Sequence, residues 1–354
     1  MSKKIGVLGA GTWGMALARL MSVYGHGVTV WSALPEEIDE LNRTRRQKNL
    51  PDMIIPDEIV FTKSIEEACK DKDIYLFAVP SVFVRRTSRL ACPFIPEGAT
   101  IVDVAKGIEP DTLMTMSEVI RSEIPQATVV ALSGPTHAEE VARDIPTTIV
   151  SACEDMETAK KVQEAFTNPV LRVYTNPDTK GVELCGALKN IIALASGISA
   201  GLGYGDNTKA ALITRGLAEM SRLGVKMGCL PETFSGLAGM GDLIVTATSI
   251  HSRNNRCGYL IGQGYTPSEA VKQVGMVVEG INAIPAAMTL AEKYGVEMPI
   301  TASVDAVINH GADPKEAVRK LMGRSTKTEL PKPVFNLNYG NTLYTVQEDL
   351  SGKA

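Results

Sequence analysis

Lys189 is the residue of this chain best suited to acid–base chemistry, and it lies in the run LCGALKNIIALASGI. On one interpretation the lysine lies on the solvent face of an amphipathic helix, where most lysines are found. On the other it faces a polar cleft beside Asn190, because the apolar neighbours leave almost no solvent face. Burial there would lower the pKa of the ammonium group toward neutral pH. Such a lysine can act as general acid and base on an alcohol or carbonyl oxygen.

A second lysine, Lys106, ends the apolar run ATIVDVAKG, and Gly107 lets the chain turn away behind it. Ligands of open parallel sheets bind beyond the carboxyl ends of the strands. Lys106 is therefore either a ligand contact at this edge or an ordinary lysine in a loop.

A glycine-proline turn leads into a helix in the stretch SGPTHAEEVA, residues 133–142. Free backbone N–H groups at a helix start suit an anionic ligand. The alternative is an ordinary helix whose start is capped by the side chain of Thr136.

A polar and basic segment, SRNNR, follows the glycine-rich run GLAGMGDLIVT. Gly239 and Gly241 precede Asp242, and Arg253 offers a planar fork of donors that matches phosphate oxygens. A basic segment of this length is usually a solvated loop. Its position after an apolar, glycine-rich segment favours a ligand-binding loop.

The scaffold for these residues begins with MSKKIGVLGAGTWGMALARL. Lys3, Lys4 and a later Ala-Leu-Ala could belong to a secretory signal. Four glycines inside the apolar segment oppose this, because each costs about 1 kcal/mol of helix stability relative to alanine. The alternative is a short strand followed by G-x-G-x-x-G and a helix, which is the dinucleotide-binding turn. The glycines of that motif are Gly9, Gly11 and Gly14.

Short apolar runs alternate with polar helical stretches up to about Val150, which predicts a parallel sheet with crossover helices. The runs are IGVLG, VTVWS, DIYLFAVPS, ATIVDVAKG, ATVVALSG and TTIVSA. After about Thr179 strand-like runs vanish and helical patterns follow. We therefore expect an α/β Rossmann domain with a mostly parallel, doubly wound sheet at residues 1–179 and an all-helical substrate domain at 180–330. The tail, residues 331–354, has little periodicity and no assigned role.

Composition is that of an ordinary globular protein, with 44% apolar and 21% charged residues and a net charge of −4. These values give no indication of a nucleic-acid partner. No run of about 20 consecutive apolar residues predicts a membrane span. The six cysteines and four histidines are scattered, which argues against a metal site and fits reduced thiols in a cytoplasm.

These stretches together resemble the bacterial-type NAD(P)-dependent glycerol-3-phosphate dehydrogenases, from Lys3 to about Arg324. The motifs that carry the resemblance are GAGTWG, AVPS, AKGIE, SGPTHAEEVA, ALKNIIALASG, AALITRG, GLAGMGDLIVT, SRN and VVEG. The resemblance implies reversible hydride transfer between NAD(P)H and dihydroxyacetone phosphate, giving glycerol 3-phosphate for phospholipid synthesis. It also implies a cytoplasmic homodimer with a small-molecule substrate.

In that family the lysine of the LKN motif, here Lys189, is the catalytic acid and base. The implied substrate-binding residues are Lys106, Gly134, Thr136, Asn190, Asp242, Thr246, Ser252, Arg253 and Asn254. The implied cofactor-binding residues are Gly9, Gly11, Thr12, Trp13, Gly14, Lys106, Ala138, Arg253, Val277 and Glu279. No metal is implied.

The second strand departs from the family pattern. Many members carry an arginine just after its tryptophan, where this chain has Ser32, Ala33 and Leu34. An arginine there would hold the 2′-phosphate of NADP. No acidic residue ends the strand to hold a ribose hydroxyl, since Glu36 and Glu37 lie beyond Pro35, and Arg43, Arg45 or Arg46 could reach the site. The pattern favours NAD and leaves use of both cofactors open.

Two other functions fit the same plan. One is a related two-domain dehydrogenase acting on a hydroxy acid, which glycerol 3-phosphate would not inhibit. The other is a non-catalytic NAD(H) sensor, which would have no need for Lys189, Asp242 and Arg253 together.

Overall fold

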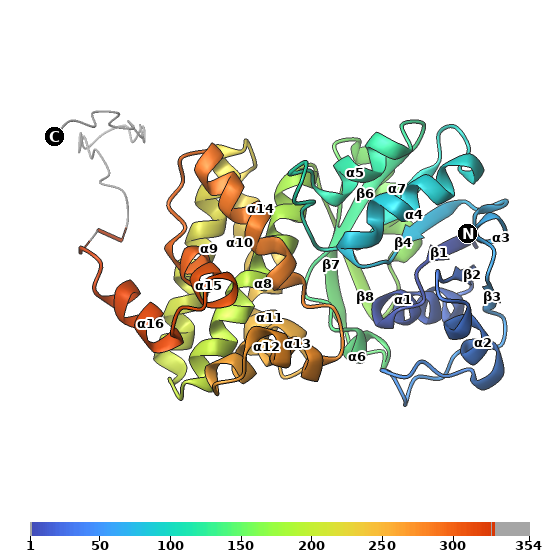
Figure 1. Cartoon of the computed structure of the whole chain (residues 1–354). Helices are drawn as coiled ribbons and strands as arrows, with labels where there is room; N and C mark the ends of the chain where they lie inside the picture. Colours follow the sequence, from blue (N-terminus) through green and yellow to red (C-terminus); the bar gives the residue numbers. More distant parts are fainter. Residues whose placement is uncertain (1, 327, 330–354) are drawn as a thin grey trace, which may run out of the picture.

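The computed structural model describes residues 2–326, 328 and 329. Two domains lie side by side, an α/β domain in blue to green, which is the predicted nucleotide-binding domain, and a helical domain in yellow-green to red (Figure 1). The sheet ends at Asn176 and the first helix of the helical domain begins at Thr179. The predicted fold class is confirmed. The expected tail, residues 331–354, lies outside the described residues.

The described residues contain one eight-stranded sheet, formed between Lys4 and Asn176, in the order β3-β2-β1-β4-β5-β6-β7-β8. All neighbouring strands are parallel except β6 and β7, which are antiparallel. The strands are β1 (Lys4–Leu8), β2 (Gly27–Trp31), β3 (Val60–Thr62), β4 (Ile74–Phe77), β5 (Thr100–Asp103), β6 (Thr128–Ser133), β7 (Thr147–Ala152) and β8 (Leu171–Asn176). The segment considered as a secretory signal thus forms β1 and the helix behind it.

Helices cover both faces of this sheet, so its central strands are buried on both sides, as expected for parallel pairing. In β4, Ile74 and Leu76 pack into one core, and Tyr75 and Phe77 pack into the other. The helical elements are α1 (Thr12–Val23), α2 (Pro35–Thr44), α3 (Ile65–Cys69), η1 (Ser81–Phe83), α4 (Val84–Ala91), η2 (Cys92–Phe94), α5 (Met116–Glu123), α6 (Ala138–Val141) and α7 (Met156–Phe166).

The helical domain is built around α8 (Thr179–Gly201), which is apolar on all sides and buried over nearly its whole length. Such a helix belongs in a protein core or a membrane. Here 89% of its most apolar stretch is buried inside the protein. The other elements are α9 (Asp206–Lys226), α10 (Pro231–Ser235), η3 (Leu237–Gly241), α11 (Asp242–Thr248), α12 (Arg253–Gly262), α13 (Pro267–Val274), α14 (Glu279–Lys293), α15 (Pro299–Asn309) and α16 (Pro314–Met322).

Glycines bring α8 and α12 into backbone contact. A Cβ on Gly197 would lie 2.0 Å from the Asn255 carbonyl oxygen, and one on Gly258 would lie 2.1 Å from that of Leu194. Gly201 and Gly262 leave equally little room. Because no side chain separates them, the backbones of the two helices lie at a short and fixed distance from each other.

Candidate active site

Asp242 joins the two lysines singled out in the sequence. It begins α11, is 1% exposed, and accepts a hydrogen bond on Oδ1 from Lys189 Nζ at 2.5 Å. Lys106, just after β5, donates to the other oxygen, Oδ2, at 2.7 Å. Both lysines therefore contact one carboxylate at the junction of the two domains.

Lys189 lies in the core of α8, 4% exposed, and not on a solvent face. Its Nζ also donates to Thr246 Oγ1 at 2.6 Å, and that hydroxyl donates to the Asp242 carbonyl at 2.6 Å. Burial lowers the pKa of Lys189 from 10.5 to about 7, an effect that Asp242 opposes and Lys106 reinforces. Near neutral pH the amine is therefore present in both the protonated and the neutral form, as proton transfer in both directions requires.

The stretch SGPTHA meets the same cluster through Lys106. The Nζ of Lys106 donates to the Gly134 carbonyl and to Thr136 Oγ1, both at 3.1 Å. Gly134 has φ of +144°, which favours glycine, and a Cβ there would press on Ile149. The N-cap residue of α6 is His137, so the alternative in which Thr136 caps the helix is wrong. Thr136 holds Lys106 instead.

A second group of polar side chains lies beside Lys189. Asn254 donates from Nδ2 to Asn190 Oδ1 at 2.9 Å and accepts from the Gly280 N–H at 2.8 Å. Ser252 is buried and caps α12, accepting from the Asn255 N–H at 3.2 Å. Arg253, the first residue of α12, is exposed, so its guanidinium is accessible to a ligand. Together these residues form a polar wall with one accessible cation.

The glycine-rich turn fits a dinucleotide. Gly9 has φ of +124°, and a Cβ there would lie 2.6 Å from the Ala78 carbonyl oxygen. Gly14 packs on Gly9, whereas nothing lies within 4 Å of a Cβ on Gly11, which leaves space for the pyrophosphate to approach the backbone. No side chain caps the start of α1, so its first N–H groups suit an anion. A bound nicotinamide would supply or accept the hydride.

The remaining predicted cofactor residues come from several elements. Thr12 and Trp13 start α1, and Thr12 Oγ1 accepts from Asn49 Nδ2 at 3.1 Å. Ala138 starts α6, and Val277 is half-buried two residues before α14.

Glu279 binds the nucleotide-binding domain directly. Its carboxylate accepts from the Ser81 N–H at 3.0 Å and from Ser81 Oγ at 2.6 Å. Ser81 packs in turn on Gly107, where a Cβ would lie 2.3 Å from the serine Cβ. Ser81 is not among the predicted site residues, although its place in the AVPS motif, after β4 at the carboxyl edge of the sheet, is a usable signal.

The described residues also bear on a possible metal site. Residues 2–326, 328 and 329 contain no group of three His, Cys, Asp or Glu side chains that could hold a metal ion. The six cysteines are free thiols.

Comparison with known proteins connects both domains to one family. A family model described as the NAD-dependent glycerol-3-phosphate dehydrogenase N-terminus matches residues 4–159, and one for the C-terminus of the same family matches residues 178–319.

Individual relatives agree with these models. "Glycerol-3-phosphate dehydrogenase [NAD(P)+] 2" of Lactobacillus delbrueckii subsp. bulgaricus is 69% identical over 335 residues, covering 93% of this chain and 99% of that protein. "Glycerol-3-phosphate dehydrogenase [NAD(P)+]" of Agathobacter rectalis is 54% identical, covering 92% of this chain and 97% of that protein. The crystal structure of glycerol-3-phosphate dehydrogenase (gpsA) from Coxiella burnetii matches with a TM-score of 0.86 at 36% identity, covering 91% and 99%. The chain belongs to the NAD-dependent glycerol-3-phosphate dehydrogenase family.

Proposed function

We propose that this protein catalyses the reversible reduction of dihydroxyacetone phosphate to glycerol 3-phosphate with NADH or NADPH, supplying glycerol 3-phosphate for phospholipid synthesis. The observation that carries the proposal is Lys189, buried with a pKa of about 7 and bonded to Asp242. Relatives that cover nearly the whole chain are named for this reaction and these cofactors.

Proton transfer is the task of Lys189 in both directions. In reduction its ammonium group gives a proton to the ketone oxygen as hydride reaches the carbon. In oxidation the neutral amine takes the hydroxyl proton. Lys106 and Asn190 stabilise the charge that develops on oxygen, and Asp242 and Thr246 orient the lysine.

The phosphate of the substrate supplies orientation. We assign it to Arg253, Asn254 and Ser252, because Arg253 is exposed at the start of α12 and Asn254 is held against Asn190. Binding energy from this remote group positions the reacting carbon. Gly134 and Thr136 complete the substrate side through Lys106.

The decisive experiment is oxidation of NADH and of NADPH by the purified protein with dihydroxyacetone phosphate. Wild type should consume the cofactor, and Lys189→Ala should lose about 10²–10⁴-fold in turnover while keeping its NADH dissociation constant. Near wild-type turnover in the variant would reject the role of Lys189. A folded protein that binds NADH but reduces only a keto acid to its hydroxy acid, or reduces no substrate, would favour one of the two alternative functions.

We also propose that the protein is a cytoplasmic homodimer. Between α9, α15 and α16 lies an apolar cavity of about 940 Å³. A second copy of the chain that covers this surface would remove its apolar lining from water. Residues lining it include Leu212, Val225, Ile300, Val307 and Leu321. Light scattering after size exclusion should give twice the 37.9 kDa of the chain, and Leu212→Glu should shift that mass toward the monomer.

A further inference from the structure

The side chain of Glu37 lies beside the end of β2, although the strand ends six residues earlier in the sequence. Pro35 opens α2 and places Glu37 in the first turn of that helix. The Glu37 carboxylate then reaches back and accepts a hydrogen bond from Ser32 Oγ at 2.6 Å. Ser32 is buried and directly follows Trp31, the last residue of β2. In the sequence Glu37 lies beyond the strand, but in the folded protein its carboxylate lies beside the end of β2.

The end of β2 is also where the glycine-rich turn is held. The Gly9 N–H donates to the Trp31 carbonyl at 2.8 Å, and Leu8 pairs with Trp31 in the parallel register of β1 and β2. Ser32 and Glu37 therefore flank the turn that fits a pyrophosphate. In nucleotide-binding domains of this plan, an acid at this position bonds the ribose 2′-hydroxyl of NAD, and an arginine accommodates the 2′-phosphate of NADP.

Two of the three nearby arginines are engaged elsewhere. Arg43, in the last turn of α2, forms an ion pair with Glu40 at 2.5 Å. Arg45 donates to the backbone carbonyls of Asp57 and Ile59 and covers the ring of Phe61. Arg46 is exposed and remains as a cation in this segment.

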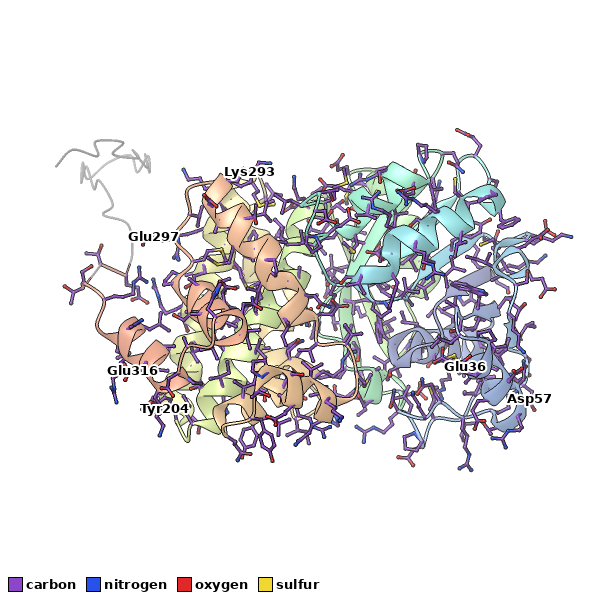
Figure 2. The ribbon with its side chains drawn as sticks, viewed as in Figure 1. Glu36, Asp57, Tyr204, Lys293, Glu297 and Glu316 are labelled. Carbon is purple, nitrogen blue, oxygen red and sulfur yellow. The ribbon has the colours of Figure 1, made fainter. Side chains whose placement is uncertain are left out.

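Two further charged side chains lie near β2. Lys63, which follows β3, is paired with Asp39 at 2.6 Å. Glu36, labelled on the nucleotide-binding side of the molecule in Figure 2, precedes Glu37 and is exposed. A phosphate carrying about two negative charges would meet the Glu37 carboxylate without a committed arginine to offset it.

We propose that Glu37 determines cofactor specificity: its carboxylate accepts a hydrogen bond from the 2′-hydroxyl of the adenosine ribose and repels a 2′-phosphate, so the protein prefers NAD(H) over NADP(H). Ser32 is the positioning residue, because its hydroxyl fixes the carboxylate. The inference rests on the proposed use of a nicotinamide cofactor, and it names which cofactor the site selects.

Binding measurements test this without turnover. Dissociation constants of NADH and NADPH would be measured by fluorescence for wild type, Glu37→Gln, Ser32→Ala and the control Glu36→Gln. Competition by ADP-ribose and by its 2′-phosphate isolates the contribution of the ribose. Wild type should bind NADH at least about tenfold more tightly than NADPH, since a hydrogen bond to a charged group is lost with the wrong ligand.

The variants should differ in the ratio of their NADPH and NADH dissociation constants. Glu37→Gln should remove most of the tenfold preference by weakening NADH and strengthening NADPH, and Ser32→Ala should remove part of it. Glu36→Gln lacks only an exposed neighbouring charge and should keep the wild-type ratio. Glu37→Asp keeps the charge but shortens the side chain, so it should still reject NADPH while binding NADH more weakly.

Two results would overturn the inference: a wild-type preference for NADPH, or an unchanged ratio in folded Glu37→Gln. An equal change in Glu36→Gln would also overturn it, because the effect would then reflect net charge. If the ratio shifts as expected but no dihydroxyacetone phosphate is reduced, the proposed reaction fails and the assignment of Glu37 stands.

Discussion

Lys106 and Lys189 donate to opposite oxygens of one carboxylate, 2.7 Å and 2.5 Å from Asp242. One negative charge thus faces two ammonium groups in a buried site. The positive charge of Lys106 helps to depress the pKa of Lys189. A site with a net positive charge also suits an anionic ligand. The same arrangement joins the carboxyl edge of the sheet to α8 and α11.

Opposite pH dependences are expected for the two directions of the reaction. Ketone reduction needs the ammonium form of Lys189, so its kcat should decline as pH rises through about 7. Alcohol oxidation needs the neutral amine, so its kcat should decline as pH falls through the same value. Steady-state rates in both directions across this range would check the sign. Profiles that fall on the same side would exclude Lys189 as the shared acid and base.

Asp242→Asn should move this profile to lower pH. Burial and Lys106 lower the pKa of Lys189 and the carboxylate raises it, so removing the carboxylate leaves two effects that both lower this pKa. A downward shift of about one pH unit is expected, since an opposite charge at contact moves a pKa by about 1–3 units. Lys106→Met should move the profile upward. Shifts of equal sign in the two variants would contradict the shared-carboxylate arrangement.

Ser81→Ala should weaken cofactor binding through Glu279. The variant loses the hydroxyl bond at 2.6 Å but keeps the backbone bond at 3.0 Å. The KM for NADH should rise about tenfold, with kcat changed by less than about threefold. Ser88→Ala is the matched control, because Ser88 is buried in α4 and its hydroxyl bonds only the Val84 carbonyl in the described structure.

A double-mutant cycle separates positioning from folding for this pair. If Ser81 acts through Glu279, Ser81→Ala should add almost nothing in a Glu279→Ala background. Additive losses in the KM for NADH would show that Ser81 acts independently.

Asp103→Asn should stabilise the protein at alkaline pH. Asp103 is buried at the end of β5, and its Oδ2 makes no hydrogen bond within the described residues. Burial, reinforced by nearby Glu183, raises the pKa of Asp103 above 3.8, so the folded state binds more protons than the unfolded state above that pH. Wild-type stability therefore falls with rising pH, and asparagine removes this dependence.

Thermal unfolding at about pH 4 and pH 8 would measure the effect of Asp103→Asn. The variant should be more stable than wild type at the higher pH, with the difference closing toward the lower pH. A larger advantage at the lower pH would reverse the sign and reject the argument.

Much of the nucleotide-binding domain was predictable because its strands are buried on both faces and read as continuous apolar runs. Two strands escaped this signal. β3 has only three residues, and β8 (LRVYTN) alternates buried and exposed positions at the edge of the sheet. The antiparallel direction of β7 is set by tertiary pairing, because TTIVSA has the same character as the parallel strands.

For the site, the sequence identified Lys189, Lys106 and Asp242 as separate features. They meet only through long-range contacts: Lys189 and Asp242 are 53 positions apart in the sequence, and Lys106 and Asp242 are 136 positions apart. The bond between Glu279 and Ser81 spans 198 positions, and no local pattern predicts it. The return of Glu37 to β2 depends on the geometry of one short turn, which residue types alone do not specify.

The glycines between α8 and α12 restrict how this site can be altered. Since the two backbones touch, a side chain at Gly197 or Gly258 would push Asn254 away from Asn190. An enlarged substrate pocket therefore cannot come from spreading these helices apart. Enzyme engineering aimed at bulkier ketones therefore has to replace side chains of the site and leave the spacing of α8 and α12 unchanged.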